Sequence, residues 1–401
     1  MGYKFQWSAT LGSFIICILA HLYHVPNSEN ISQMNRVRLL SASMKIIKFI
    51  GFVSETVGLS SKWLIQRNCA ILLLKSKPTE VNTNLKIDNM IIEGVPVRFY
   101  YPINSIDSRF KLLPAVIYYH GGALYRGSIG ESFRIFRYSN DIVNLETHHP
   151  ITRELAVQTD FIVISVEYLL APEHPFPVGL DDCTKVTKHI LDIDNANKFN
   201  IDPTRVAIAG DSVGGNFAAV IATRLTNKNM AKNIPRLQIL IYHEVQFFDF
   251  MLPSSIGDDI LVNNHMTIEQ KKQYRPYVDW SLIPSKYRQI YKEPINDNID
   301  GDANLMKNTQ QILEPDLSPL LVENEKLSKL PATYVLTVDH DQFRDEGFIY
   351  VVHVKSNGVH VTHRHFEKTF HGSLTFLEGI FKLEIAHETL TDIVHYLKDY
   401  L

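Results

Sequence analysis

The sequence IDPTRVAIAGDSVGGN, residues 201–216, places a serine between two glycines directly after a short apolar run. The run Arg205–Gly210 predicts a strand and the stretch after Gly214 predicts a helix, so the serine lies in a strand-to-helix elbow of the form G-x-S-x-G. Such a turn strains the backbone at Ser212 and presents its hydroxyl at the carboxyl end of a sheet, and the flanking glycines make room for it. We expect Ser212 to be a nucleophile; the alternative is a glycine-rich turn without chemistry.

A second motif lies about ninety residues upstream, where His120-Gly121-Gly122-Ala123 ends the apolar run 112–120. Acyl transfer needs backbone N–H donors aimed at the oxyanion that develops during the reaction. Glycines allow the backbone to approach a substrate closely. We expect Gly121 and Gly122, together with the N–H of Val213, to supply these donors.

A base and an orienting acid are expected in the order Ser, Asp, His. The strand predicted at 332–338 is followed by Asp339-His340-Asp341, and the strand at 361–366 is followed by Phe370-His371-Gly372. His371 is in a loop after a strand, where a base can reach Ser212. Asp341 is the expected acid, and Asp339 is the alternative.

His363 and His365 alternate with other side chains along the same predicted strand. We interpret them as strand residues. The alternative, an H-x-H metal site, lacks an evident third ligand, so we expect no metal.

Alternation of strands and helices predicts an α/β sheet. Residues 91–102 and 112–120 predict strands by their β-branched and aromatic content. Short, continuous apolar runs typical of parallel strands buried on both faces occur at 161–170, 205–210, 237–245 and 332–338. Helical stretches separate them, for example at 180–193 and 215–226. Residues 251–313 are polar and irregular, which predicts an insertion that contributes to a cap.

The composition excludes several classes of protein. There are 40 Lys and Arg against 43 Asp and Glu, which leaves no basic field for nucleic acid. Three cysteines are too few for a disulfide scaffold or a cysteine-rich zinc module. Whether Cys69 pairs with Cys183 stays open. Asn30 begins a glycosylation sequon by pattern, although it lies close to the apolar N-terminal segment.

The N-terminus predicts a membrane anchor. No charged residue occurs from Phe5 to Ser28, and the apolar core Ser8–Val25 is long enough to span a bilayer and longer than the core of a typical signal peptide. A signal cleaved after Ala20 and a buried helix are the alternatives. Basic residues occur on both sides of the segment, so charge does not decide its orientation.

Apolar residues at three- and four-residue spacing predict that residues 37–74 are helical. This helix is interpreted either as packed on the domain or as a lid that touches both the membrane and a pocket. The expected organisation is therefore an anchor segment at 1–27, a helical cap or linker at 28–89, and a catalytic domain at 90–401 with the cap insertion at 251–313.

At this point a family resemblance is evident. The chain resembles the hormone-sensitive lipase family of α/β-hydrolases, in particular its arylacetamide deacetylase group. The segments that carry the resemblance are YYHGGALYRGS (118–128), EYLLAPEHPFPVGLDDC (167–183), IDPTRVAIAGDSVGGN (201–216), DLSPLL (316–321), LPATYVLTVDHDQFRDEG (330–347) and NGVHVTHRHFEKTFHG (357–372).

The resemblance implies an α/β-hydrolase fold, with a mostly parallel central sheet flanked by helices and a cap built from N-terminal helices and an insertion. It implies that Ser212, Asp341 and His371 form a catalytic triad, and that His120, Gly121 and Gly122 form the oxyanion motif. It also implies a single-pass type II protein of the endoplasmic reticulum membrane, with its catalytic domain in the lumen.

Four departures from the family pattern leave every catalytic group in place. Ala123 stands where the family usually has a third glycine, and Leu169 stands where it usually has arginine. His243 stands where it usually has proline. The two cysteines that arylacetamide deacetylase carries are replaced together, by Tyr125 and Val338.

The sequence therefore predicts a serine carboxylesterase that acts on lipophilic esters, and less often amides, without a cofactor. The alternative is a receptor for small lipophilic molecules on the same fold, which has no catalytic activity. Such receptors typically lose a triad member, and here all three residues are present.

Overall fold

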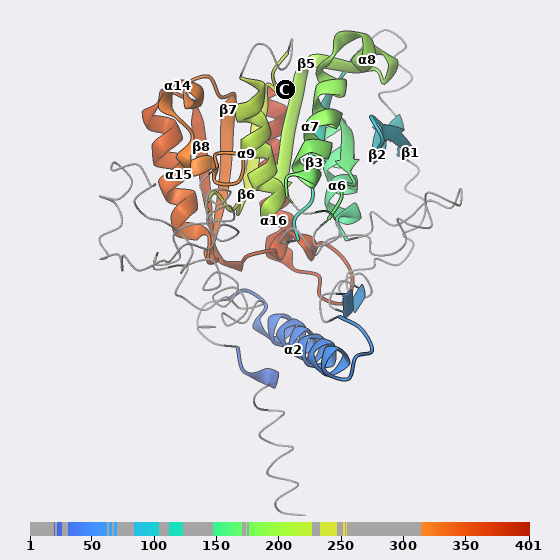
Figure 1. The fold of residues 1–401 in the computed structure, drawn as a ribbon, viewed down its shortest axis with the longest axis vertical. Helices are drawn as coiled ribbons and strands as arrows, with labels where there is room; N and C mark the ends of the chain where they lie inside the picture. The colour runs from blue at the N-terminus through green and yellow to red at the C-terminus, as the bar shows by residue number, and fades with distance from the viewer. Residues whose placement is uncertain are drawn as a thin grey trace, which may run out of the picture.

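The computed structural model describes residues 20, 22–25, 31–61, 64–65, 68–69, 84–103, 112–122, 147–170, 174, 176–226, 233–246, 252, 254 and 314–401. Within these residues, one sheet of eight strands runs in the order β1-β2-β4-β3-β5-β6-β7-β8. Figure 1 shows this sheet between two layers of helices, with helix α2 lying apart from the layers at one end of the strands.

Six strands, β3 to β8, pair in parallel, and the first two form an antiparallel hairpin that joins them through β4. The strands are β1 (Leu85–Ile92), β2 (Val95–Pro102), β3 (Leu113–Tyr119), β4 (Ile162–Val166), β5 (Ile201–Asp211), β6 (Leu237–Ile241), β7 (Ala332–His340) and β8 (Val361–Phe370). The mostly parallel sheet expected from the sequence is confirmed. β3, β4 and β6 are buried along their whole length because helices cover both faces.

The single strand expected over 91–102 is wrong, because the chain reverses within it. β1 ends at Ile92 and β2 begins at Val95, and these two residues pair across the turn. Both turn residues have positive φ, 51° at Glu93 and 81° at Gly94. A two-residue hairpin loop of this kind needs positive φ at both positions, which Gly94 adopts without strain.

The helices form two layers on the sheet. The helices are α2 (Met34–Thr56), α6 (His149–Thr159), α7 (Val178–Leu191), α8 (Ile193–Lys198), α9 (Val213–Leu225), α14 (Asn324–Leu327), α15 (Arg344–Ser356) and α16 (Glu384–Tyr400), with 3₁₀ turns η3 (Pro319–Leu321) and η4 (Ser373–Thr375). One apolar cluster packs α7, α8, α9 and α15 on one face of the sheet, and a second packs α6 and α16 on the other. Val37 and Leu40 of α2 join this second cluster. Neighbouring residues of β3 divide between the clusters, Ile117 entering the first and Tyr118 the second.

Helix α2 ends at Thr56, so the continuous helix expected over 37–74 is wrong. Gly58 has φ 73°, which a residue with a side chain adopts only at a cost. Its N–H donates to the Glu55 carbonyl, and the Leu59 N–H donates to the Ser54 carbonyl. These two bonds are those of a Schellman motif, which ends a helix at a glycine.

Several expectations fall mainly outside the described residues. These are the anchor Ser8–Val25 apart from Ala20 and Leu22–Val25, the sequon at Asn30, Ala123, and the insertion 251–313 apart from residues 252 and 254. Among the described helices, none is long and apolar enough to span a bilayer. Cys69 and Cys183 are both free thiols, which answers the question of their pairing.

Candidate active site

Ser212 occupies a strained elbow between β5 and α9. Its φ of 55° and ψ of −124° lie in a region that residues with a side chain rarely adopt. A Cβ on Gly210 would collide with the Gly214 backbone, and a Cβ on Gly214 would collide with the Tyr119 carbonyl of β3. Close backbone approach therefore requires both glycines, as the motif predicted.

Ser212, His371 and Asp341 lie in one hydrogen-bonded row. Nε2 of His371 is 2.9 Å from Oγ of Ser212, and Nδ1 of His371 is 2.9 Å from Oδ1 of Asp341. A carboxylate only accepts, so Nδ1 carries a hydrogen and the neutral ring leaves Nε2 to accept from the Ser212 hydroxyl. The three residues follow β5, β8 and β7, so the carboxyl ends of parallel strands bring them together.

Backbone hydrogen bonds within its own turn fix the position of the Asp341 carboxylate. Its side chain is only 1% exposed. The backbone N–H of Phe343 donates to the same Oδ1 at 2.9 Å, and the Arg344 N–H donates to the Asp341 carbonyl at 3.2 Å. This turn at the start of α15 orients the carboxylate toward the imidazole.

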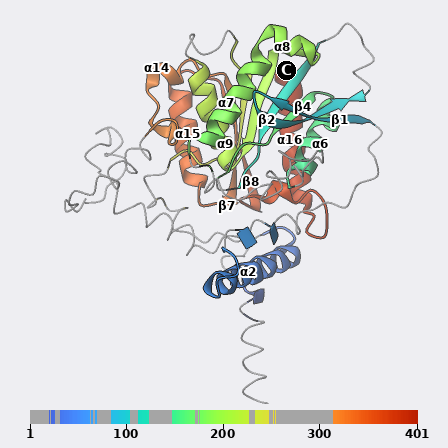
Figure 2. The ribbon, with the colours of Figure 1, turned by 45° about the vertical axis from the view of Figure 1, so that its right-hand side comes forward.

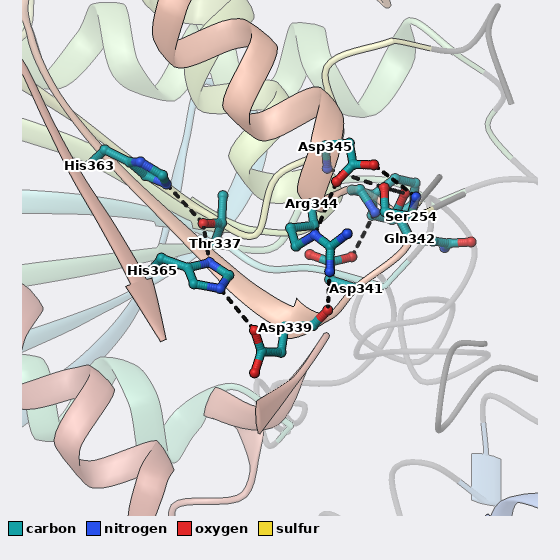
Figure 3. A network of polar contacts seen from close by, with 10 residues as sticks. Ser254, Thr337, Asp339, Asp341, Gln342, Arg344, Asp345, His363 and His365 are labelled. Carbon is teal, nitrogen blue, oxygen red and sulfur yellow. Dashed lines mark hydrogen bonds and ion pairs between the residues drawn. The ribbon is translucent and has the colours of Figure 1, made fainter. Parts of the chain in front are cut away.

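Asp339, the alternative acid, has other partners. Its Oδ1 is 2.9 Å from Nε2 of His365, and its Oδ2 accepts from the Lys368 N–H at 2.8 Å. Burial alone would raise the pKa of Asp339, but these two contacts lower it below its ordinary value. Figure 3 shows Asp339 bonded to His365 on β8, apart from Asp341.

Two aromatic side chains pack against the His371 ring. The Tyr242 ring lies 4.9 Å away and the Phe343 ring lies 5.2 Å away at a steep angle. Tyr242 has φ 35°, a strained value, and its N–H donates to the Leu336 carbonyl of β7. The sequence analysis did not identify either residue. Phe343 lies two residues after the expected acid, which is the only local signal for its role.

The Gly121 N–H was expected to face a substrate, and this expectation is wrong. The N–H donates to Oδ1 of Asp211 at 3.0 Å, and it has only one hydrogen to give. A Cβ on Gly121 would collide with the Asp211 side chain, so the glycine allows this close approach.

The other two expected donors, Gly122 and Val213, differ from Gly121 in their backbone setting. Gly122 has φ 134°, a conformation open to glycine. Val213 is the first residue of α9, so its N–H has no acceptor within the helix.

Asp211, the residue before the nucleophile, is the centre of a buried network that the sequence analysis missed. Its Oδ1 also accepts from the Tyr118 hydroxyl at 2.7 Å, and its Oδ2 is 3.4 Å from Nε2 of His148. Burial alone would raise the pKa of Asp211, but His148 and Tyr118 lower it below its ordinary value. A charged carboxylate therefore joins the elbow to the loop after β3.

The His120 side chain is buried against Tyr168 and the Gly121 carbonyl. The ring is buried, is stacked on Tyr168 at 4.3 Å, and has Nδ1 2.9 Å from the Gly121 carbonyl. The Tyr168 hydroxyl donates to the His120 carbonyl at 2.7 Å. Burial, reinforced by His148, lowers the pKa of His120 to about 4, so the ring is neutral near pH 7.

His243, which departs from the family pattern, is fully buried beneath the elbow. Its Cβ lies under Gly215 of α9, where an added methyl group would collide with it. Neither ring nitrogen has a hydrogen-bond partner among the described residues. Burial, with a smaller contribution from His363, lowers the pKa of His243 to about 3.

His363 and His365 are strand residues of β8, as expected. Nε2 of His363 and Nδ1 of His365 are each 2.9 Å from Oγ1 of Thr337, which lies between them in Figure 3. No group of three potential metal ligands occurs in the described part of the chain.

Comparisons with known proteins agree with this fold. A family described as "alpha/beta hydrolase fold" matches residues 116–375. Arylacetamide deacetylase of Bos taurus is 31% identical, covering 90% of this chain and 92% of that protein. Neutral cholesterol ester hydrolase 1 of Rattus norvegicus is 31% identical, covering 92% of this chain and 93% of that protein.

A solved structure supports the same fold. A hyperthermophilic esterase from the archaeon Pyrobaculum calidifontis superposes with a TM-score of 0.63 at 24% identity, covering 92% of this chain and 98% of that one. With matches over most of its length, the chain belongs to the α/β-hydrolase family, among the carboxylic ester hydrolases that include arylacetamide deacetylase and neutral cholesterol ester hydrolase.

Proposed function

We propose that the chain is a serine carboxylesterase that cleaves esters, and less readily amides, of lipophilic compounds. The observation that carries this proposal is the row Ser212–His371–Asp341, with its two contacts of 2.9 Å. The row lies in a chain of a family that hydrolyses carboxylic esters.

In this mechanism Oγ of Ser212 attacks the acyl carbon while Nε2 of His371 takes its proton. The imidazolium then gives the proton to the leaving oxygen or nitrogen, and water releases the acyl group by the same route in reverse. Asp341 holds the imidazole in the required tautomer and stabilises its charged form. The N–H groups of Gly122 and Val213 stabilise the tetrahedral oxyanion.

The substrate class rests on two arguments. Relatives that match over most of the chain are named for arylacetamides and for cholesterol esters, which share a large apolar group. The chain also carries an uncharged N-terminal segment, Phe5–Ser28, that favours contact with lipid.

Hydrolysis of p-nitrophenyl esters across a series of acyl lengths tests the activity. We expect turnover that Ser212→Ala abolishes and that Ser356→Ala, at the end of α15 and away from the site, leaves unchanged. Binding of the esters without turnover by the wild-type chain would instead support the receptor alternative.

We further propose that Ser8–Val25 anchors the chain in the endoplasmic reticulum membrane, with the catalytic domain in the lumen. In microsomes, alkaline carbonate should leave the chain in the membrane pellet, and protease should digest the catalytic domain only after detergent is added. A mature N-terminus directly after Ala20 would overturn the anchor. Digestion without detergent would overturn the lumenal orientation.

A further inference from the structure

Helix α2 is apolar on the face that points away from the catalytic domain. Its inner face packs on the domain through Val37, Leu40 and Met44. On the outer face, five large apolar side chains of α2 and one directly after its end, between 40% and 66% exposed, follow one another at helical spacing. They are Leu39, Ile46, Phe49, Ile50, Val53 and Val57. A soluble protein rarely leaves a continuous apolar strip of this kind in water.

The charges of α2 favour an anionic partner. The helix carries four basic residues and one acidic residue, Glu55. Arg38, Lys45 and Lys48 recur at spacings of seven and three, so they follow one flank of the helix beside the apolar strip. An apolar face flanked by basic residues is the pattern of a helix that lies in the interface of a bilayer with anionic headgroups.

The residues directly before α2 are hydrogen-bonded to the chain near His371. The Ser32 N–H donates to the Lys368 carbonyl, three residues before His371, and the Glu384 N–H donates to the Gln33 side chain. Figures 1 and 2 both show α2 lying across one end of the molecule, apart from α8 and α14 at the other end of the strands. The same end receives Val25, which is buried in the cluster that contains α2. Val25 belongs in the sequence to the uncharged segment Phe5–Ser28.

We propose that the outer face of α2 lies in the lipid interface, so that the catalytic end of the sheet faces the bilayer and takes its substrate from it. The docking of α2 is independent of the catalytic roles assigned above. The supply of substrate from the bilayer rests on the proposed esterase function.

Site-specific fluorescence quenching tests the docking in the full-length chain. Cys17 and Cys69 are replaced by serine, and Cys183 is kept because it is buried. Phe49→Cys or Val53→Cys then provides a single reactive thiol, which carries an environment-sensitive fluorophore. The chain is reconstituted in mixed phosphatidylcholine and phosphatidylserine vesicles. The matched control is Val352→Cys, an exposed apolar position on α15 with 67% exposure.

We expect lipids with nitroxide-labelled acyl chains to quench the α2 labels severalfold more strongly than the Val352 label, and aqueous iodide to show the opposite order. Labels on α2 that iodide quenches as strongly as the control would overturn the proposal. Labels protected from both quenchers would also overturn it, because a protein partner or a second copy would then cover the face.

A second measurement concerns the supply of substrate. The variant Phe49→Asp/Val53→Asp should lower hydrolysis of a long-chain ester carried in the vesicles severalfold and leave hydrolysis of a water-soluble acetyl ester unchanged. Val352→Asp should change neither rate. Equal loss on both esters would show that the substitutions act on the fold. Absence of hydrolysis in the wild-type chain would contradict the proposed esterase function, and the quenching result would stand separately.

Discussion

The backbone N–H of Gly121 donates to the carboxylate of Asp211 at 3.0 Å, which ties the loop after β3 to the residue that precedes the nucleophile. The two residues are 90 positions apart in the chain. Because the same carboxylate also accepts from Tyr118, the glycine loop and the elbow share one buried anion. We therefore expect the geometry of the proposed oxyanion donors to depend on the charge of Asp211.

Substitution of Asp211 tests this dependence. In Asp211→Asn, the negative charge is lost and an NH₂ group replaces one carboxylate oxygen. Because the Gly121 N–H and the Tyr118 hydroxyl donate to the same Oδ1, they either bond a neutral amide oxygen, with the NH₂ group turned toward His148, or lose their acceptor together. We expect kcat on a small acetyl ester to fall about 10- to 100-fold with KM nearly unchanged, because a loop shift of about 1 Å displaces the donors from the oxyanion. Asp202→Asn, which alters a carboxylate at the start of β5, is the control. Wild-type kcat in Asp211→Asn would show that the carboxylate does not position the loop.

The identity of the acid is tested by two parallel substitutions. Asp341→Asn should lower turnover by about 10⁴-fold while the fold survives, because the amide no longer selects the required tautomer of His371. Asp339→Asn should have a small effect, since its partners are His365 and Lys368. The reverse ranking of the two variants would place the acid two residues earlier.

The nucleophile and the base should behave as one unit. Ser212→Ala and His371→Ala should each lower turnover by several orders of magnitude, and the double variant should be little worse than either single variant. Steady-state rates for the three variants make the comparison. Additive losses would contradict the assignment of the two residues to one proton transfer.

Buried histidines predict loss of stability in acid. Burial lowers the pKa of His243 from 6.5 to about 3, so the unfolded chain takes up a proton that the folded chain refuses. Stability should therefore fall as the pH drops from 6.5 toward 3, by up to about 1.4 kcal/mol per pH unit for each such group. His120 and His149, each with a pKa lowered to about 4, act in the same direction.

Replacement of His243 measures how much this residue contributes to the loss of stability in acid. His243→Leu should make the dependence of unfolding free energy on pH shallower by about one proton over this range, as measured by chemical denaturation at several pH values. Val352→Leu, which removes no titratable group at an exposed position on α15, is the control. An unaltered slope in His243→Leu would mean that the ring is protonated in the folded chain.

The features that local sequence could predict are those with local causes. The apolar runs at 161–170, 205–210, 237–245 and 332–338 contain parallel strands, and the elbow at Ser212 appears where G-x-S-x-G predicted it. The helix predicted over 37–74 and the strand predicted over 91–102 were both too long. Each contains a glycine with positive φ at the break: Gly58 ends the helix, and Gly94 lies in the turn that reverses the strand. The order of Ser212, Asp341 and His371 was predictable, and the strands bring their side chains together.

The rest of the site depends on contacts between distant parts of the chain. His148 reaches Asp211 across 63 residues and Tyr118 reaches it across 93, and no periodicity or motif indicates either contact. The Gly121 N–H was expected to bind the oxyanion, and it instead donates to Asp211, a contact that local sequence also does not indicate. Its acceptor lies on another strand, and only the packed sheet brings the two groups together.

The central claim is that Ser212 is the nucleophile that His371 activates. A fluorophosphonate probe, followed by digestion and mass spectrometry, tests it most directly because it identifies the residue that forms the covalent bond. We expect one adduct per chain, on the peptide that contains Ser212, with hydrolysis lost in proportion to labelling and with no adduct in Ser212→Ala. An adduct on another residue, or full hydrolytic activity in a chain whose Ser212 is completely labelled, would contradict the account.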